Sequence, residues 1–336
     1  MNYYKVLNKQ SYHLGDYSIV PIRDEDKWDI MKWRNEQIYH LRQSKYLLAE
    51  DQEQYFANVV SKLFNQSEPC QILFSYLYKG KCIGYGGLVH INWIDKNAEI
   101  SFIMNTLLEK DEFAKHWSIF LYLAERVAFM ELFLHKIFTY AFDLRPHLYN
   151  VLESNNYVKE ATLSDHCFFD GHYKDVVIHS KFKNRFHLRT IERADKKIVF
   201  EWSNEEQTRK NSFNSDPILF EEHALWFDKK LTSSQAIYLI CEYEGSPAGL
   251  IRFDMNDSYT TIGIIISANF RGKGLAMPFI VEACKLFRII SYNKSIRAFI
   301  KPENLASKRS FEKSGFEYKG NQIINNIDAL VYEYNK

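Results

Sequence analysis

The stretch ANFRGKGLAMPFI, residues 268–280, decides the fold of the second half of this chain. It follows an apolar, β-branched run and leads into a segment whose apolar residues recur every three or four positions from Ala276 to Phe287. That order predicts a strand, a glycine-rich bend and an amphipathic helix. Pro278 has no N–H and fits only the first turn of a helix, so the helix should begin close to the bend.

The spacing of the glycines distinguishes three known phosphate-binding patterns. A Walker loop requires Ser or Thr after its Gly-Lys pair, but Lys273 is followed by another glycine. A dinucleotide fingerprint requires Gly or Ala at position 277, where Met277 stands. The remaining pattern, R-x-x-G-x-A, is satisfied by Arg271, Gly274 and Ala276. We call residues 271–276 the glycine bend.

The glycine bend is predicted to bind an anion. The backbone N–H groups from Gly272 to Ala276 precede the helix and have no partner within it, and they lie at the positive end of its dipole. Arg271 and Lys273 can add charge. An ordinary polar turn between a strand and a helix is the alternative interpretation of the hexapeptide taken alone.

Composition excludes several classes of protein. The 336 residues are 46% hydrophobic and 25% charged, which suits a globular chain of two domains. A net charge of +1, with scattered Lys and Arg, argues against nucleic acid or an anionic membrane as a partner. No apolar run approaches the ~20 residues of a membrane span, and the first ten residues do not resemble a signal peptide.

The five cysteines are widely spaced and form no C-x-x-C pair. Neither a disulfide framework nor a zinc site is indicated, so we expect no metal and a cytoplasmic protein.

The two halves show the same order of elements, which predicts a duplicated domain. Trp33 in the first half matches Trp202 in the second, and the hairpin-like stretch 78–88 matches 243–253. A basic, polar segment at 181–190 marks the boundary, which predicts domains at 1–180 and 186–336. Chance similarity between two α/β patterns is the alternative.

With KPENLASKRSFEKSGFE at 301–317, the strand, bend and helix resemble motifs A and B of the GNAT (GCN5-related) N-acetyltransferases. The resemblance extends from about residue 186 to the C-terminus. It implies an α/β (α+β) fold of two tandem GNAT-like domains, each with a mixed, mostly antiparallel sheet flanked by helices. It also implies acetyl-CoA as co-substrate and transfer of an acetyl group to a small amine without a metal.

The resemblance implies roles for particular residues. The cofactor-binding set is Ile264, Ile265, Ile266, Arg271, Gly272, Lys273, Gly274, Leu275, Ala276, Asn304 and Ser307. Asn304 is equally suited to cap a helix. Phe311 stands where many relatives carry the Tyr that protonates the departing thiolate, so Ser307, a water or another Tyr would have to replace it.

The stretch 201–231 resembles the acceptor side of acetyltransferases that act on nucleotide-linked amino sugars, including those of the pseudaminic acid type used for surface glycans. The implied substrate residues are Asn204, Arg209, His223 and Trp226. Asp254 or His223, acting through water, are the candidate bases. An amphipathic helix pair with a core of aromatic residues is the alternative interpretation.

Other functions remain open at this point: a CoA-binding sensor or scaffold without catalysis, or acetylation of a protein N-terminus or an aminoglycoside. The sequence does not indicate an oligomeric state.

The first half lacks the glycine bend. KDEFAKHW, residues 110–117, occupies its place, and Asp111 and Glu112 would repel a pyrophosphate. Arg145 stands where the second half has Asn304. We therefore expect the first half to keep a GNAT-like fold without binding CoA in the usual way. A misaligned second active site is the alternative.

Overall fold

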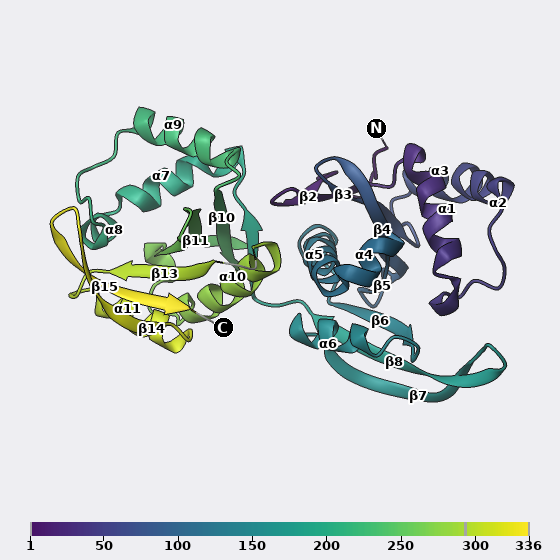
Figure 1. Ribbon diagram of the computed structural model, residues 1–336. Coiled ribbons are helices and arrows are strands. Elements are labelled where there is room, and N and C mark those ends of the chain that lie inside the picture. The colour runs from purple at the N-terminus through teal and green to yellow at the C-terminus, as the bar shows by residue number, and fades with distance from the viewer. Residues whose placement is uncertain (1, 292–293, 335–336) are drawn as a thin grey trace. The chain divides into compact units, whose positions relative to one another are not determined.

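The structure, a computed structural model, describes residues 2–291 and 294–334. The chain forms two compact units, residues 1–183 and 184–336, which we call the first and second domains. Each domain is built on a β-sheet with helices packed on both faces, the two tandem GNAT-like α/β domains expected from the sequence (Figure 1). None of the helices in the described part of the chain is long and apolar enough to span a bilayer.

The first domain contains eight strands in one sheet. These are β1 Tyr12–Leu14, β2 Tyr17–Pro21, β3 Ile72–Tyr78, β4 Lys81–Asn92, β5 Asn97–Met104, β6 Lys136–Phe142, β7 Val158–Phe169 and β8 His172–Phe182. Its α-helices are α1 Lys27–Glu36, α2 Ala49–Tyr55, α3 Ser61–Leu63, α4 Thr106–Asp111, α5 Phe113–Arg126 and α6 His147–Ser154.

The second domain contains seven strands in one sheet. These are β9 Phe186–Thr190, β10 Ala236–Tyr243, β11 Ser246–Met255, β12 Tyr259–Ile266, β13 Ser295–Ile300, β14 Glu317–Ile324 and β15 Ile327–Tyr334. Its α-helices are α7 Lys196–Asn204, α8 Glu206–Asn211, α9 Phe220–Leu231, α10 Ala276–Ile290 and α11 Leu305–Lys313.

The two sheets have the same topology. The strand order β2-β3-β4-β5-β6-β8-β7 in the first domain corresponds to β9-β10-β11-β12-β13-β15-β14 in the second, and β1 is an addition at one edge. In both sheets a single neighbouring pair runs parallel, β5 with β6 and β12 with β13, and all other pairs are antiparallel. This agreement confirms the internal repeat.

Helices cover both faces because strand residues alternate between them. In the second domain Tyr238 and Ile240 pack with α7 and α9, whereas Phe253 stacks on Phe287 of α10, with ring centroids 4.5 Å apart. In the first domain Trp33 of α1 belongs to the core on one face. On the other face α5 packs against the sheet. Each domain therefore has its own two-sided core.

The parallel pair separates after three residues in each domain. In the second domain pairing of β12 with β13 ends at Thr261 and Arg297, after which β13 continues alongside β15 only. In the first domain pairing of β5 with β6 ends at Glu99 and Phe138. Beyond these points one edge of β5 and of β12 has no strand partner.

The turns occur where the sequence predicts them. Gly80 and Gly245 have φ of 80° and 78° in the β3–β4 and β10–β11 hairpins, a conformation that glycine adopts without strain. Asn156 and Gly315 have φ of 64° and 87° at the ends of α6 and α11. After β5 the chain forms the short helix α4 and then the long helix α5, whereas α10 alone follows the glycine bend after β12.

Candidate functional site

The glycine bend joins β12 to α10. Helix α10 begins at Ala276, so Pro278 lies in its first turn, where the missing N–H costs no hydrogen bond. Gly272 and Gly274 have φ of 76° and 73°. A Cβ added to either glycine would meet no atom within 4 Å, so the space beside the bend is open.

The backbone N–H groups of residues 272–276 have no acceptor within the described part of the chain. No side chain caps α10, whose N-cap residue is Leu275. Unpaired N–H groups at a helix N-terminus attract anions, and left-handed glycines allow a bulky anion to approach the backbone. The bend therefore has the geometry of a phosphate site.

The side chain of Arg271 is paired with other groups of the protein. Its Nη2 lies 2.6 Å from Glu205 Oε2 and its Nη1 lies 3.0 Å from Oε1, while Nε donates to Ile266 O. Hydrogen bonds from Arg271 hold the pKa of Glu205 down to about 2. The guanidinium thus ties the bend to the start of α8 while its charge is largely neutralised. Lys273 lies 4.7 Å from the centroid of the Phe270 ring.

The residues Ile264, Ile265 and Ile266 lie on the part of β12 that pairs only with β11. Their strand edge toward β13 has no strand partner, and it leads directly to the glycine bend. Backbone groups along this edge are available to a ligand that extends from the bend between the separating strands.

Asn304 caps the next helix. Its Oδ1 accepts from the Ser307 N–H at 3.1 Å, which is an ordinary N-cap bond of α11. The Ser307 hydroxyl has no hydrogen-bond partner within the described residues. Phe311, on the same helix, is buried against Phe316 and has no proton to donate.

The predicted acceptor residues Asn204 and Arg209 hold one loop. Asn204 exchanges two hydrogen bonds with the backbone of Ile218, of 2.7 and 2.8 Å. Arg209 donates to Asn214 O, Asp216 O and the Ser212 hydroxyl. Arg209 Nε is buried without a partner, and no carboxylate pairs with this guanidinium within the described chain.

His223 and Asp254, the candidate bases, both form hydrogen bonds within the protein. His223 is 2% exposed, lies against Phe227, and its Nε2 donates to Lys196 O at 3.0 Å. Burial lowers the pKa of its imidazole. Asp254 accepts from Lys230 Nζ and from the Tyr238 hydroxyl, and burial raises the pKa of that phenol. Trp226 is half-buried between the His223 and Tyr238 rings.

Two family models match this chain, and both are described as an acetyltransferase (GNAT) domain. One covers residues 185–317 and the other covers residues 19–178. The chain carries two GNAT acetyltransferase domains in tandem. This membership makes it an acyltransferase that uses acetyl-CoA as co-substrate for N-acetylation. No curated protein matches the sequence.

Solved structures of GNAT enzymes resemble one domain at a time. A spermidine N-acetyltransferase from Vibrio cholerae, in complex with CoA and spermine, is 20% identical with a TM-score of 0.45, over 51% of this chain and 97% of that one. A spermidine N-acetyltransferase chimera of Vibrio cholerae and hSSAT is 22% identical with a TM-score of 0.43, over 50% of this chain and 96% of that one.

The second GNAT domain has groups that fit acetyl-CoA. The free N–H groups and open space at the glycine bend suit a pyrophosphate, and the unpaired edge of β12 suits an extended amide-containing arm. No group of three His, Cys, Asp or Glu side chains within the described residues is arranged to hold a metal ion.

The first GNAT domain differs at the corresponding place. Asn105 caps α4 there, with its side chain accepting from Leu107 N at 3.0 Å. Glu109 of α4 forms an ion pair with Arg145 at 3.1 Å. The segment after β5 is therefore closed by the protein's own groups, where the segment after β12 is open.

Three further residues shape the second site. Glu205 caps α8 by accepting from the Thr208 N–H and hydroxyl, and Arg271 donates to both residues. The three-residue spacing of an acid and a threonine was the available signal. Lys301 is 8% exposed and donates to Lys210 O at 2.9 Å, which joins the end of β13 to α8. No local pattern indicated that contact.

Proposed function

We propose that the second domain transfers the acetyl group of acetyl-CoA to the amine of a small acceptor, with the CoA pyrophosphate bound at the glycine bend. One observation carries the proposal: five consecutive N–H groups, at 272–276, stand without acceptors at the N-terminus of α10, beside two glycines with open space. Among the described residues of the first domain, the corresponding segment after β5 has no such run of N–H groups without acceptors.

The reaction needs positioning and proton transfer. The neutral amine nitrogen attacks the thioester carbonyl carbon, the C–S bond breaks, and the sulfur leaves with the bonding electrons as a thiolate. The proton lost by the amine then reaches the sulfur, which gives an amide and the CoA thiol. Backbone N–H groups at the free edge of β12, within 264–266, would polarise the carbonyl.

Ser307 is the proposed donor of the proton to sulfur. Its hydroxyl has no hydrogen-bond partner among the residues that the structure describes, whereas Phe311 cannot donate and the His223 imidazole is enclosed in the core. Asp254 would accept the amine proton through water, because its carboxylate is already bound by Lys230 and Tyr238.

The proposed acceptor is an amino sugar carried on a nucleotide. The resemblance of 201–231 to the acceptor side of such enzymes suggests it, and Arg209 supports it because this partly buried guanidinium lacks a carboxylate partner and suits a phosphate. Trp226 offers a half-buried ring for stacking. Asn204 and His223 would act on the acceptor through the segments they hold.

A thiol-release assay tests the proposal. The intact protein is given acetyl-CoA with a UDP-linked amino sugar, the free amino sugar, spermidine or a peptide amine. We expect CoA release and a product heavier by one acetyl group with the nucleotide sugar. Release with spermidine alone would contradict the proposed acceptor but support the proposed transferase activity. No release with any amine would favour a CoA-binding sensor or scaffold.

Two glycine variants test the location of the site. Gly274→Val should lower kcat/KM for acetyl-CoA about hundredfold, because it removes access to the bend amides, whose hydrogen bonds to a charged group are each worth ~1.5–3 kcal/mol. Gly245→Val is the matched control: its φ of 78° and its open surroundings are similar, but it lies in the β10–β11 hairpin. Equal losses in both variants would contradict the assignment.

A further inference from the structure

We propose that the first domain binds a small organic anion with a planar, largely apolar body, in a cavity of about 460 Å³ between its separating strands. The cavity is lined by β5 and β6 beyond the point where their pairing ends, and by residues from α1 and β4. Its volume lies in the range of small-molecule sites. We call it the first-domain cavity.

Arg34 gives the first-domain cavity an uncompensated cation. Its Nη1 donates to the Tyr85 hydroxyl at 2.6 Å and its Nε donates to Gln43 Oε1 at 3.0 Å, and both partners are neutral. No carboxylate pairs with Arg34 among the residues that the structure describes. A half-buried guanidinium with unused N–H groups is suited to a carboxylate or phosphate.

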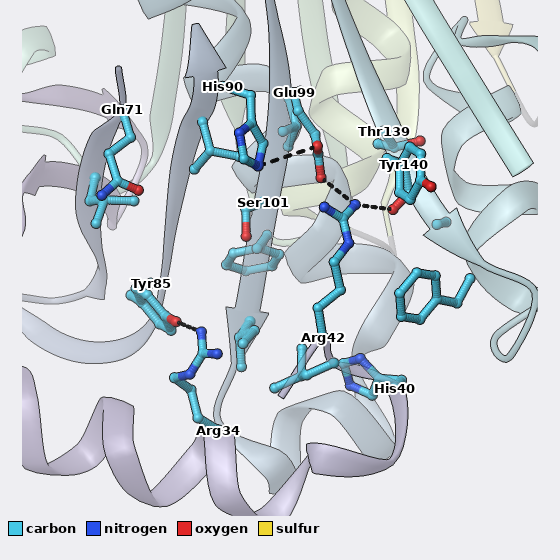
Figure 2. A pocket seen from close by; sticks show the side chains of 18 of the residues that line it. Arg34, His40, Arg42, Gln71, Tyr85, His90, Glu99, Ser101, Thr139 and Tyr140 are labelled. Atoms are coloured by element: carbon cyan, nitrogen blue, oxygen red, sulfur yellow. Dashed lines mark hydrogen bonds and ion pairs between the residues drawn. The ribbon is translucent and has the colours of Figure 1, made fainter. Parts of the chain in front are cut away.

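On the opposite wall of the first-domain cavity the cationic side chains already have an anionic partner (Figure 2). Arg42 Nη2 lies 3.1 Å from Glu99 Oε1 and donates to Tyr140 O, and His90 Nε2 lies 3.9 Å from the same carboxylate. Figure 2 shows this chain of contacts facing the Arg34–Tyr85 pair, with the Ser101 hydroxyl between them. The lining thus contains more cationic than anionic side chains, which favours an anion over an amine.

Two buried polar side chains in the lining have no hydrogen bond. The Thr139 hydroxyl and both ring nitrogens of His40 are without partners in the described chain, and these residues are 3% and 8% exposed. Glu109 lies 3.6 Å from His40 Nε2, beyond hydrogen-bond distance. A buried polar atom left unpaired costs about 1–3 kcal/mol, so a ligand that pairs with these groups gains that energy back.

Aromatic rings form much of the remaining wall. Tyr55, Tyr85, Trp117, Tyr140 and Phe142 line the first-domain cavity. Flat rings pack well against a planar body and leave its charged group to Arg34. Acetyl-CoA does not fit this description, because α4, with acidic Glu109, Asp111 and Glu112 in and beside it, stands where the second domain has its bend.

Calorimetric titration of the intact protein with defined probes tests this inference. Benzoate and phenyl phosphate carry a ring with each type of anion, inorganic phosphate carries the anion alone, and benzylamine carries the ring with a cation. We expect one or both ring-bearing anions to bind more tightly than inorganic phosphate, and benzylamine not to bind. Which of the two binds identifies the anion as carboxylate or phosphate.

Arg34→Gln should weaken binding of the ring-bearing anion tenfold to hundredfold, since it removes a charged hydrogen bond. Lys32→Gln is the matched control, because Lys32 is an exposed cation on the same helix. Thr139→Val, which keeps the side-chain shape, should weaken binding severalfold and does not disturb an ion pair. Unchanged affinity in Arg34→Gln, or no binding of either ring-bearing anion, would overturn the proposal.

Anion binding by the first domain can be tested separately from the proposed transferase activity of the second domain. Gly274→Val should weaken acetyl-CoA binding about hundredfold and leave binding of the ring-bearing anion unchanged. Tighter binding of benzylamine than of benzoate would show that the first-domain cavity accepts an amine, which also overturns the proposal.

Discussion

The segments that follow β5 and β12 occupy the same place in two copies of one fold. Their backbone N–H groups differ: acceptors within the protein are present after β5 and absent, among the described residues, at 272–276 after β12. After β5, Asn105 and the turns of α4 supply acceptors, as in the bond from Glu112 N to Leu108 O. After β12, two left-handed glycines leave the N–H groups of 272–276 open. A few residues therefore decide whether the copy can receive an anion there.

The first domain, which lacks the glycine bend, has a ligand-sized cavity where β5 and β6 separate. Its lining contains the unpaired Thr139 hydroxyl and Arg34, which has no carboxylate partner among the described residues. Closing the cofactor entrance did not fill the space between the strands. We therefore propose that the two copies of one topology carry sites of different chemistry.

The largest expected effect concerns stoichiometry. Titration with acetyl-CoA should give one site per chain, because only the bend of the second domain, within the described residues, offers free N–H groups beside left-handed glycines. Gly274→Val should weaken acetyl-CoA binding at that site about hundredfold. Two sites per chain, or one site whose affinity is unchanged in Gly274→Val, would show that the first domain binds the co-substrate.

The next effect is an acid sensitivity of the first domain. Burial lowers the pKa of His40 to about 3 and that of His116 to about 4, whereas an unfolded imidazole titrates near ~6.5. The unfolded chain therefore binds more protons below that pH, so this stability is complete above pH ~6.5 and is lost as pH falls toward 4. Each imidazole contributes a slope of at most ~1.4 kcal/mol per pH unit.

Urea unfolding across this pH range checks the prediction. His116→Gln should reduce the pH dependence of the free energy of unfolding by the contribution of about one proton. His116 is buried, and its ring contacts the Tyr76 hydroxyl at 3.0 Å. An unchanged slope in His116→Gln would mean that this imidazole is not held neutral.

A smaller effect distinguishes the two roles of Asn304. Asn304→Ala should cost about 1 kcal/mol of stability through the lost N-cap of α11, and Asn304→Ser should recover most of it. Acetyl-CoA affinity should change by no more than about threefold, because the side-chain oxygen already accepts from Ser307 N. A tenfold loss of affinity with normal stability would assign Asn304 to the cofactor.

The smallest effect is expected for Glu205→Gln. The ion pair with Arg271 is about one-third exposed, with side-chain exposures of 32% and 35%, so its loss should cost less than ~1 kcal/mol. The pKa of Glu205 is depressed to about 2, so the contribution is complete above the unfolded value and shrinks as pH falls below about 4.5. Thermal unfolding at pH 7, 5 and 4, with Glu206→Gln as the neighbouring control, measures it.

Local patterns predicted the parts of this molecule whose causes are local. The strand, bend and helix around Gly274 follow from glycine's access to positive φ, from Pro278 at a helix start and from the periodicity of α10. The repeat was visible because both copies need the same turns, as Gly80 and Gly245 show.

Partners distant in sequence determined the remaining features. Arg271 was expected to face the ligand, but Glu205, 66 residues away, binds its guanidinium. His223 has the residue type of a base, yet Phe227 and the Lys196 carbonyl enclose it in the core. A side chain's protonation and availability depend on which groups surround it, and a linear pattern does not specify those groups.

The sequence by itself determined the two-domain GNAT fold and the position of the glycine bend, because backbone preferences and apolar periodicity act over a few residues. Folding determined which side chains are free. Arg34 has neutral hydrogen-bond partners because the fold places Tyr85 of β4 and Gln43 of a loop beside it, and Asp254 is occupied because α9 places Lys230 beside it. Such charge balances arise from the packing of separate elements, which elementary sequence patterns do not encode.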